Sequence, residues 1–174
     1  MHSPNSWTLL VYKIPSQPSR LRLQIWRKLQ RMGALYLQDA VCVVPSRLEL
    51  DENMQYIAEA IEEMGGIYHL FQASAFFTEG SERLEEGFRA LADAAFEKIA
   101  WRMEAIQSAM TENASLTALE GAEEELKRER VAYLRAKRLA YFGSDKEAAA
   151  EKRLERVRHF CGCFGPTSSR RHKR

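Results

Sequence analysis

Several features that define common protein classes are scarce or absent in this sequence. Its 174 residues include three cysteines and five prolines. Three cysteines are too few, and odd in number, for the disulfide framework of a small secreted domain. No apolar run approaches the roughly 18 residues that a membrane-spanning helix needs, and Met1 to Ser6 lack the basic start and apolar stretch of a secretory signal. We therefore expect a cytoplasmic protein with no membrane anchor.

Sequence motifs of the common enzyme classes are missing as well. The chain has no P-loop, dinucleotide fingerprint, nucleophile elbow or HExxH motif. The Cys161-x-Cys163 pair near His159 offers at most three ligands, whereas a structural zinc site needs four. Cys42 falls in an expected core strand and is interpreted as a small buried hydrophobe. We expect no catalytic site, no metal and no cofactor.

Charge is balanced overall but unevenly distributed along the chain. The formal net charge is +2. Residues 1–50 carry 7 basic and 2 acidic side chains, residues 51–125 carry 4 and 17, and residues 126–174 carry 15 and 5. Three interpretations stay open: solvated faces of long helices, a basic surface for an anion or a nucleic acid, and pairing of acidic with basic helices within or between chains.

The hydrophobic pattern predicts an α+β fold. Four short apolar runs are typical of strands, and two segments carry apolar side chains at helical spacing. Their order, β-α-β-β-α-β, is that of a ferredoxin-like domain, in which two helices cover one face of a four-stranded antiparallel sheet. The other face needs cover from a homodimer partner or from the rest of the chain. In chain order the segments are residues 7–12, 20–32, 34–37, 40–44, 51–64 and 67–71, with Gln38-Asp39 as a tight hairpin turn.

The remaining sequence predicts an α-helical extension of about three helices. Ser81 is a candidate cap for the first of them, and the capping boxes Thr117-x-x-Glu120 and Ser144-x-x-Glu147 open the other two. The end of the chain is small, polar and basic, which is typical of disorder. The expected parts are a ferredoxin-like domain at residues 1–78, the helical extension at 79–160 and a disordered basic tail at 161–174.

One segment carries a family resemblance. Residues 7–45 read WTLLVYKIPSQPSRLRLQIWRKLQRMGALYLQDAVCVVP, and the pieces WTLLVYKIP, RxxxWRKLxRMGA and LQDAVCVVP resemble the amino-terminal domain of the chromate-resistance regulator ChrB. The later pieces AEAIEEMGG and KRLAYFG look like the same family. More distantly, the segment is similar to the central domain of PaaX-type repressors. The resemblance covers most of residues 7–160 and implies a bacterial, non-enzymatic regulator of transcription that binds DNA and senses chromate.

Departures from related families narrow this expectation. The small CRISPR adaptation nuclease has a similar strand-helix-hairpin, with a metal-holding Asp at the end of its first strand. The matching position here is Lys13, and a lysine repels a divalent cation but attracts an oxyanion. Because six residues precede the first strand, we expect no winged helix like that of PaaX, and we expect no counterpart of the carboxy-terminal domain of ChrB. The resemblance therefore implies a stand-alone version of the ChrB amino-terminal domain.

Basic residues are the candidates for binding. Chromate is a tetrahedral dianion, so a site for it needs fixed positive donors, which Lys and Arg supply. Three functions stay open: an oxyanion sensor, a dimeric nucleic-acid-binding protein whose affinity falls with salt, and an interaction scaffold without a small ligand. The candidate residues for an oxyanion or nucleic-acid site are Lys13, Arg20, Arg27, Lys28, Arg31, Arg135 and Arg138.

Overall fold

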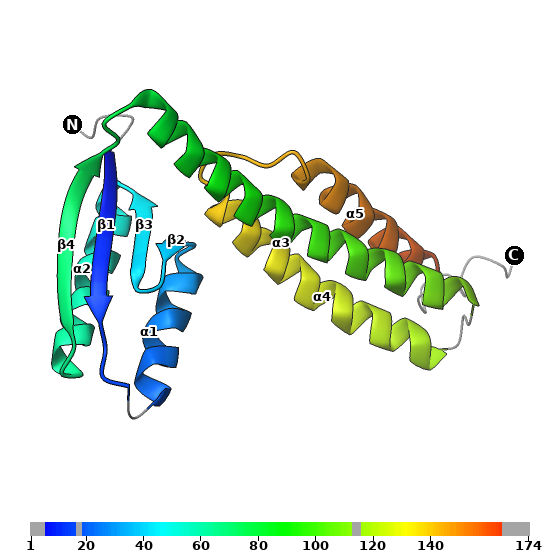
Figure 1. Ribbon diagram of the computed structural model, residues 1–174. Helices are drawn as coiled ribbons and strands as arrows, with labels where there is room; N and C mark the ends of the chain where they lie inside the picture. Colours follow the sequence, from blue (N-terminus) through cyan, green and yellow to red (C-terminus); the bar gives the residue numbers. More distant parts are fainter. Residues whose placement is uncertain (1–5, 17–18, 113–115, 165–174) are drawn as a thin grey trace, which may run out of the picture. The chain divides into compact units, whose positions relative to one another are not determined.

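The computed structural model describes residues 6–16, 19–112 and 116–164. Contacts within the chain divide it into two compact units, Met1–Phe88 and Arg89–Arg174, which we call the sheet unit and the helical unit. The boundary falls inside helix α3. In chain order the elements are β1 (Ser6–Lys13), α1 (Ser19–Arg31), β2 (Leu35–Gln38), β3 (Val41–Pro45), α2 (Leu48–Glu63), β4 (Ile67–Ser74), α3 (Thr78–Glu112), α4 (Leu116–Leu139) and α5 (Glu147–Phe164) (Figure 1).

The sheet unit has the predicted α+β composition. Its four antiparallel strands lie in the order β2-β3-β1-β4, so β2 and β4 form the two edges (Figure 1). Leu10 at the centre of β1 lies opposite Cys42 on β3 and Leu70 on β4. Leu10 and Cys42 are fully buried, which places the core of this unit at the middle of the sheet.

Successive residues of β1 point to opposite faces of the sheet, and different helices meet each face. The Thr8 hydroxyl donates to Asp51 of α2. On the same face α1 contacts α2, with Lys28 Nζ 4.6 Å from the centroid of the Tyr56 ring. On the other face Trp7 stacks on Phe88 of α3, with ring centroids 5.8 Å apart. A later part of the chain thus covers part of the second face. The sequence had left open whether that cover comes from the same chain or from a homodimer partner.

Both helices of the sheet unit are followed by a glycine, whereas the hairpin turn contains none. Gly33 after α1 has φ 70° and Gly65 after α2 has φ 75°, the left-handed conformation in which a helix commonly ends. The hairpin turn between β2 and β3 lies at Asp39-Ala40, one residue later than predicted, because Gln38 still pairs with Val41 across a bulge. Ala40 takes φ 60° there, a conformation that a non-glycine residue rarely adopts.

The helical unit contains most of α3 together with α4 and α5, and acidic side chains of α3 pair with basic side chains later in the chain. Glu97 of α3 lies 3.2 Å from Lys146 before α5, and Glu104 of α3 lies 2.9 Å from Arg153 of α5. Both pairs join an acidic side chain of α3 to a basic one from residues 126–174. The apolar core of the unit includes Phe96, Ile99 and Met103 of α3, Tyr133 and Ala136 of α4, and Ala150, Leu154, Val157 and Cys161 of α5.

Two details of the helical unit differ from the sequence expectation. Ser144 and Glu147 form no capping box: α5 begins at Glu147, whose carboxylate instead accepts from Lys137 (2.8 Å) and the Tyr133 hydroxyl (3.3 Å) of α4. The helix α5 continues to Phe164, so Cys161 is helical and buried rather than part of a tail. Residues 165–174 and the side chain of Thr117 lie outside the described residues.

Candidate functional site

A pocket of about 830 Å³ opens beside the end of β1, between α1 and the β2–β3 hairpin. Its wall combines three aromatic rings with two cations and one carboxylate. We call it the tyrosine pocket. Its lining residues are Tyr12, Lys13, Ile14, Arg22, Trp26, Tyr36, Gln38, Asp39 and Ala40.

Strand pairing brings the two tyrosines of this pocket together. Tyr36 of β2 lies opposite Cys42 of β3, and Cys42 lies opposite Leu10 of β1. The backbone N–H of Tyr12 donates to the carbonyl oxygen of Ala40 at 3.0 Å, which ties the hairpin to β1. As a result, the hydroxyl oxygens of Tyr12 and Tyr36 lie 3.2 Å apart and form a hydrogen bond.

Partial burial keeps both phenols protonated. It raises the pKa of Tyr12, although the hydrogen bond from Tyr36 opposes the rise. It also raises the pKa of Tyr36 well above its usual value, and there the hydrogen bond to Tyr12 adds to the effect. A hydroxyl pair has two protons, and one of them makes the bond between the rings. The second proton is not used in that bond.

Two cations contribute positive charge at the pocket. Lys13 is the exposed last residue of β1. Arg22 lies in the first turns of α1, and its Nη2 donates to the carbonyl oxygen of Ser16 at 3.3 Å. Within residues 6–16, 19–112 and 116–164, neither cation has an ion-pair partner. Asp39 in the hairpin turn supplies one opposing negative charge, so the pocket lining carries one net positive charge.

The other basic residues that the sequence singled out lie apart from this pocket. Arg20, Arg27 and Arg31 are exposed on α1, and none of them lines it. Lys28 lies over the Tyr56 ring of α2 instead. Arg135 and Arg138 are exposed on α4, in the helical unit. The structure therefore groups Lys13 with Arg22, a residue that the sequence analysis did not single out.

Eight of the nine lining residues were not among the sequence candidates, and the sequence signals of four of them differ. Arg22 and Trp26 are four residues apart, a spacing that places two side chains on the same side of a helix. That spacing could have found them. Tyr12 and Tyr36 meet only through the register of three strands, which no local pattern reveals.

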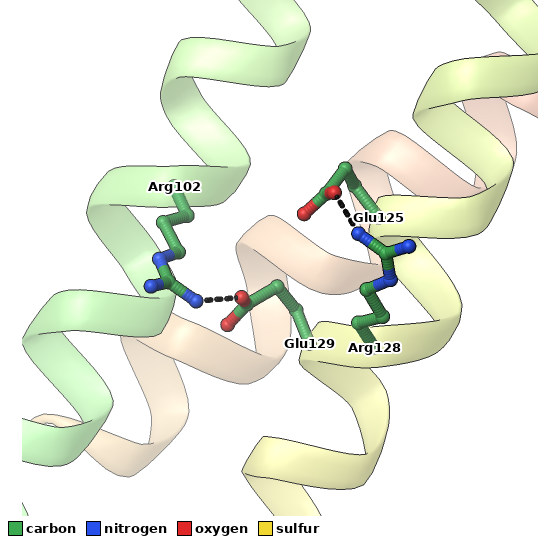
Figure 2. A network of polar contacts seen from close by, with 4 residues as sticks. All are labelled: Arg102, Glu125, Arg128 and Glu129. Atoms are coloured by element: carbon green, nitrogen blue, oxygen red, sulfur yellow. Dashed lines mark hydrogen bonds and ion pairs between the residues drawn. The ribbon is translucent and has the colours of Figure 1, made fainter.

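The helical unit has polar contacts of its own. Arg102 of α3 donates to the buried carboxylate of Glu129 on α4, while Arg128 and Glu125 pair along α4 at 2.7 Å (Figure 2). In both contacts a carboxylate neutralises an arginine, and the contact between Arg102 and Glu129 also connects α3 to α4. Because each cation in Figure 2 already has an anionic partner, this network is less suited than the tyrosine pocket to bind an anion.

The described residues contain neither a cluster of metal ligands nor a membrane-spanning helix. No group of three or more His, Cys, Asp or Glu side chains is placed to hold a metal ion there. Across the same part of the chain, no helix combines the length and the apolar content needed to cross a membrane.

Comparison with known proteins identifies relatives of this chain. The family model described as "Protein ChrB, N-terminal" matches residues 22–167. Protein ChrB of Cupriavidus metallidurans (strain ATCC 43123 / DSM 2839 / NBRC 102507 / CH34) is 30% identical over 100 residues, which are 57% of this chain and 29% of that protein. The aligned region thus spans less than a third of the relative's length. The family match includes Arg22, Trp26 and Tyr36 of the pocket and begins after Lys13.

Proposed function

The chain belongs to the family of ChrB amino-terminal domains, and from this premise we propose that it is a non-enzymatic regulator of transcription associated with chromate resistance. In this proposal the sheet unit is a ferredoxin-like domain that senses a tetrahedral oxyanion, such as chromate, in the tyrosine pocket. One observation carries the proposal: the same pocket is lined by two cations that have no ion-pair partner among the described residues and by a tyrosine pair with one proton to spare.

The chemistry of these groups suits a dianion. Lys13 offers a compact positive charge, and Arg22 offers a planar set of N–H donors that matches neighbouring oxygens of one anion. The protonated tyrosine pair adds a neutral donor, which orients the anion without a cost in charge repulsion. Asp39 repels the anion, so binding needs both cations.

The position of the pocket suits a sensor. Lys13 ends β1, Arg22 lies in the first turn of α1 and Tyr36 lies on β2, so one bound anion would contact three separate elements. An anion that draws these groups together stabilises one arrangement of the β1–α1 connection over others. A ligand shifts such an equilibrium only through a difference in its contacts with the two arrangements.

Calorimetric titration of the purified chain with chromate tests this function. Sulfate, a tetrahedral dianion, serves as the redox-inert comparison. We expect Lys13→Ala and Arg22→Ala each to weaken chromate binding about tenfold, which corresponds to about 1.4 kcal/mol for one charged hydrogen bond. Arg27→Ala removes an exposed arginine of the same helix that does not line the pocket, and it is the matched control. Unchanged affinity in both pocket variants, or an equal loss in the control, would overturn the proposal.

A second candidate function is contact with duplex DNA. On α4, Lys127, Arg128 and Lys137 are paired with carboxylates. By contrast, Arg135 and Arg138 are exposed and have no ion-pair partner among the described residues. They lie three residues apart and therefore on one side of the helix. We propose that these two arginines contact phosphates.

Fluorescence anisotropy with random duplex DNA at two or more salt concentrations, with and without chromate, tests the DNA proposal. Exchanging both Arg135 and Arg138 for Ala is expected to lower the slope of log affinity against log salt by about 2, since each neutralised phosphate contributes about 0.9. Release of DNA by chromate would connect the two functions. An unchanged slope in the double variant would refute the contact by these residues.

A further inference from the structure

The two edges of the sheet are built differently. The edge strand β2 has four residues and a register shift between Tyr36 and Gln38. The edge strand β4 has eight residues and pairs with β1 in unbroken register, from Ser6 opposite Ser74 to Lys13 opposite Ile67. Short strands and bulges are devices that keep a sheet edge from pairing with another chain. The edge at β4 has neither device.

The sequence of β4 also lacks the residues that protect an edge. It reads IYHLFQAS and contains no Lys, Arg, Asp, Glu or Pro, in a chain whose residues are 29% charged. Its outer side therefore presents backbone donors and acceptors beside uncharged side chains. Figure 1 shows β4 beside β1 as the last strand of the sheet. An exposed edge of this kind is a template for an added strand.

Side chains on one face of β4 leave apolar surface next to that edge. Ile67, His69 and Phe71 lie on the sheet face opposite to α1 and α2, because they pair with alternate residues of β1. Ile67 is 63% exposed and Phe71 is 51% exposed. The rings of His69 and Phe71 stack with centroids 6.2 Å apart. An added strand would place its own side chains of the same face directly beside this row.

We propose that β4 pairs antiparallel with β4 of a second copy of this chain, so that two sheets join into one of eight strands. The occupant follows from self-complementarity. An antiparallel pair of identical strands has a two-fold axis, which closes the assembly at a dimer. A neutral strand meets no like charge in its own copy, whereas like charges directly opposite destabilise a pair.

The side chains of β4 also favour one register. A two-fold axis through Leu70 places Leu70 opposite its own copy and Phe71 opposite His69 of the second copy. The same axis places Ile67 opposite Ala73 and Tyr68 opposite Gln72. An axis through Phe71 would instead pair Leu70 with Gln72. The register centred on Leu70 matches apolar with apolar and ring with ring.

Sedimentation velocity of the full chain over a range of concentrations tests the dimer. The parent is expected to be dimeric. Phe71→Lys places a cation on each copy near the axis and beside a second copy of His69, so it should raise the dimer dissociation constant at least tenfold. Val131→Lys, at a side chain 69% exposed on α4, is the matched control and should leave the dimer intact. Circular dichroism verifies that both variants are folded.

Two results would overturn the proposal. One is a monomeric parent at every concentration. The other is a dimer whose dissociation constant does not change in Phe71→Lys. If Val131→Lys abolished that dimer, the contact would belong to the helical unit instead. This test does not depend on anion binding, so its outcome is independent of the tyrosine pocket.

Disulfide formation tests the register. Directly opposed residues of an antiparallel pair have Cα atoms about 4.5–5.5 Å apart, within the range that a disulfide spans. Leu70→Cys is therefore expected to yield a covalent dimer on mild oxidation. Ser74→Cys on the same strand does not face its own copy in this register and should yield none. The parent controls for the native cysteines, of which Cys42 and Cys161 are buried. A dimer without a Leu70→Cys cross-link would refute the register and, with it, the proposed interface.

Discussion

Gly66→Ala is expected to destabilise the sheet unit because the glycine lies against backbone that cannot rotate away. A Cβ at this position would lie 2.7 Å from the Lys13 carbonyl oxygen and 2.8 Å from the Ile61 carbonyl oxygen. It would also lie 2.6 Å from Cγ2 of Ile61. The amide of Gly66 already donates to the Ile61 carbonyl at 2.9 Å, which holds the close approach in place. Relief requires the end of α2 or the end of β1 to move.

The expected loss is about 2–3 kcal/mol, the upper part of the range for an added methyl group in a tightly packed site. Gly87→Ala is the matched comparison. There the nearest atom is Cδ2 of Leu35 at 2.8 Å, the end of a side chain that can change rotamer. Ala inside α3 also gains about 1 kcal/mol of helix propensity over Gly. The stability of Gly87→Ala should therefore stay within about 1 kcal/mol of the parent.

Urea unfolding followed by tryptophan fluorescence measures both variants. Trp7 is 3% exposed in the sheet unit and reports on its unfolding, whereas Trp101 is 68% exposed and should change little. Because the added methyl presses on Lys13, Gly66→Ala should also weaken anion binding at the tyrosine pocket. A stability within about 0.5 kcal/mol of the parent, or a loss no larger than that of Gly87→Ala, would refute the reasoning.

Three further predictions concern the two cores. Phe96→Ala empties a fully buried position of the helical unit and should cost about 3–5 kcal/mol, as measured by thermal melting in circular dichroism. Burial raises the pKa of the Cys42 thiol from 9.0 to about 12, so its stabilising contribution is complete below pH 9 and is lost as the pH rises towards 12. The urea midpoint should therefore fall above pH 9, and less so in Cys42→Ala; an equal fall in both would contradict this. Glu129→Gln, which removes the buried charge facing Arg102, should lower the melting temperature more than Glu125→Gln at an exposed pair, and the reverse order would refute this reading.

Local patterns accounted for most of the secondary structure. The strand β1 and the helix α1 follow from apolar runs and apolar periodicity, and both α1 and α2 end within one residue of the predicted ranges. The predicted position of the hairpin turn was wrong by one residue, because Ala40 adopts a left-handed conformation that its side chain does not favour. The strand pairing around Ala40, rather than its own preference, selects that conformation.

The binding site was predicted less well than the fold. Lys13 was identified from the sequence, and it lines the pocket. The basic face of α1 was expected to supply its partners, but Arg27 and Arg31 lie further along the helix and line no part of that pocket. Arg22 and Trp26 share the side of α1 that borders the pocket, so Arg22 is the second cation. A helical periodicity shows which residues share a face, but it does not show which of the faces meets a strand.

The sequence by itself determined the succession of strands and helices, the ends of the first two helices and the uneven distribution of charge. Each of these depends on residues close together in the chain. The tertiary structure alone decided that Tyr12 and Tyr36 share a hydrogen bond, that Arg22 joins Lys13 at one pocket, and that a strand without charge, β4, lies at an edge of the sheet. These depend on strand order and register, which arise from long-range packing rather than from any local preference.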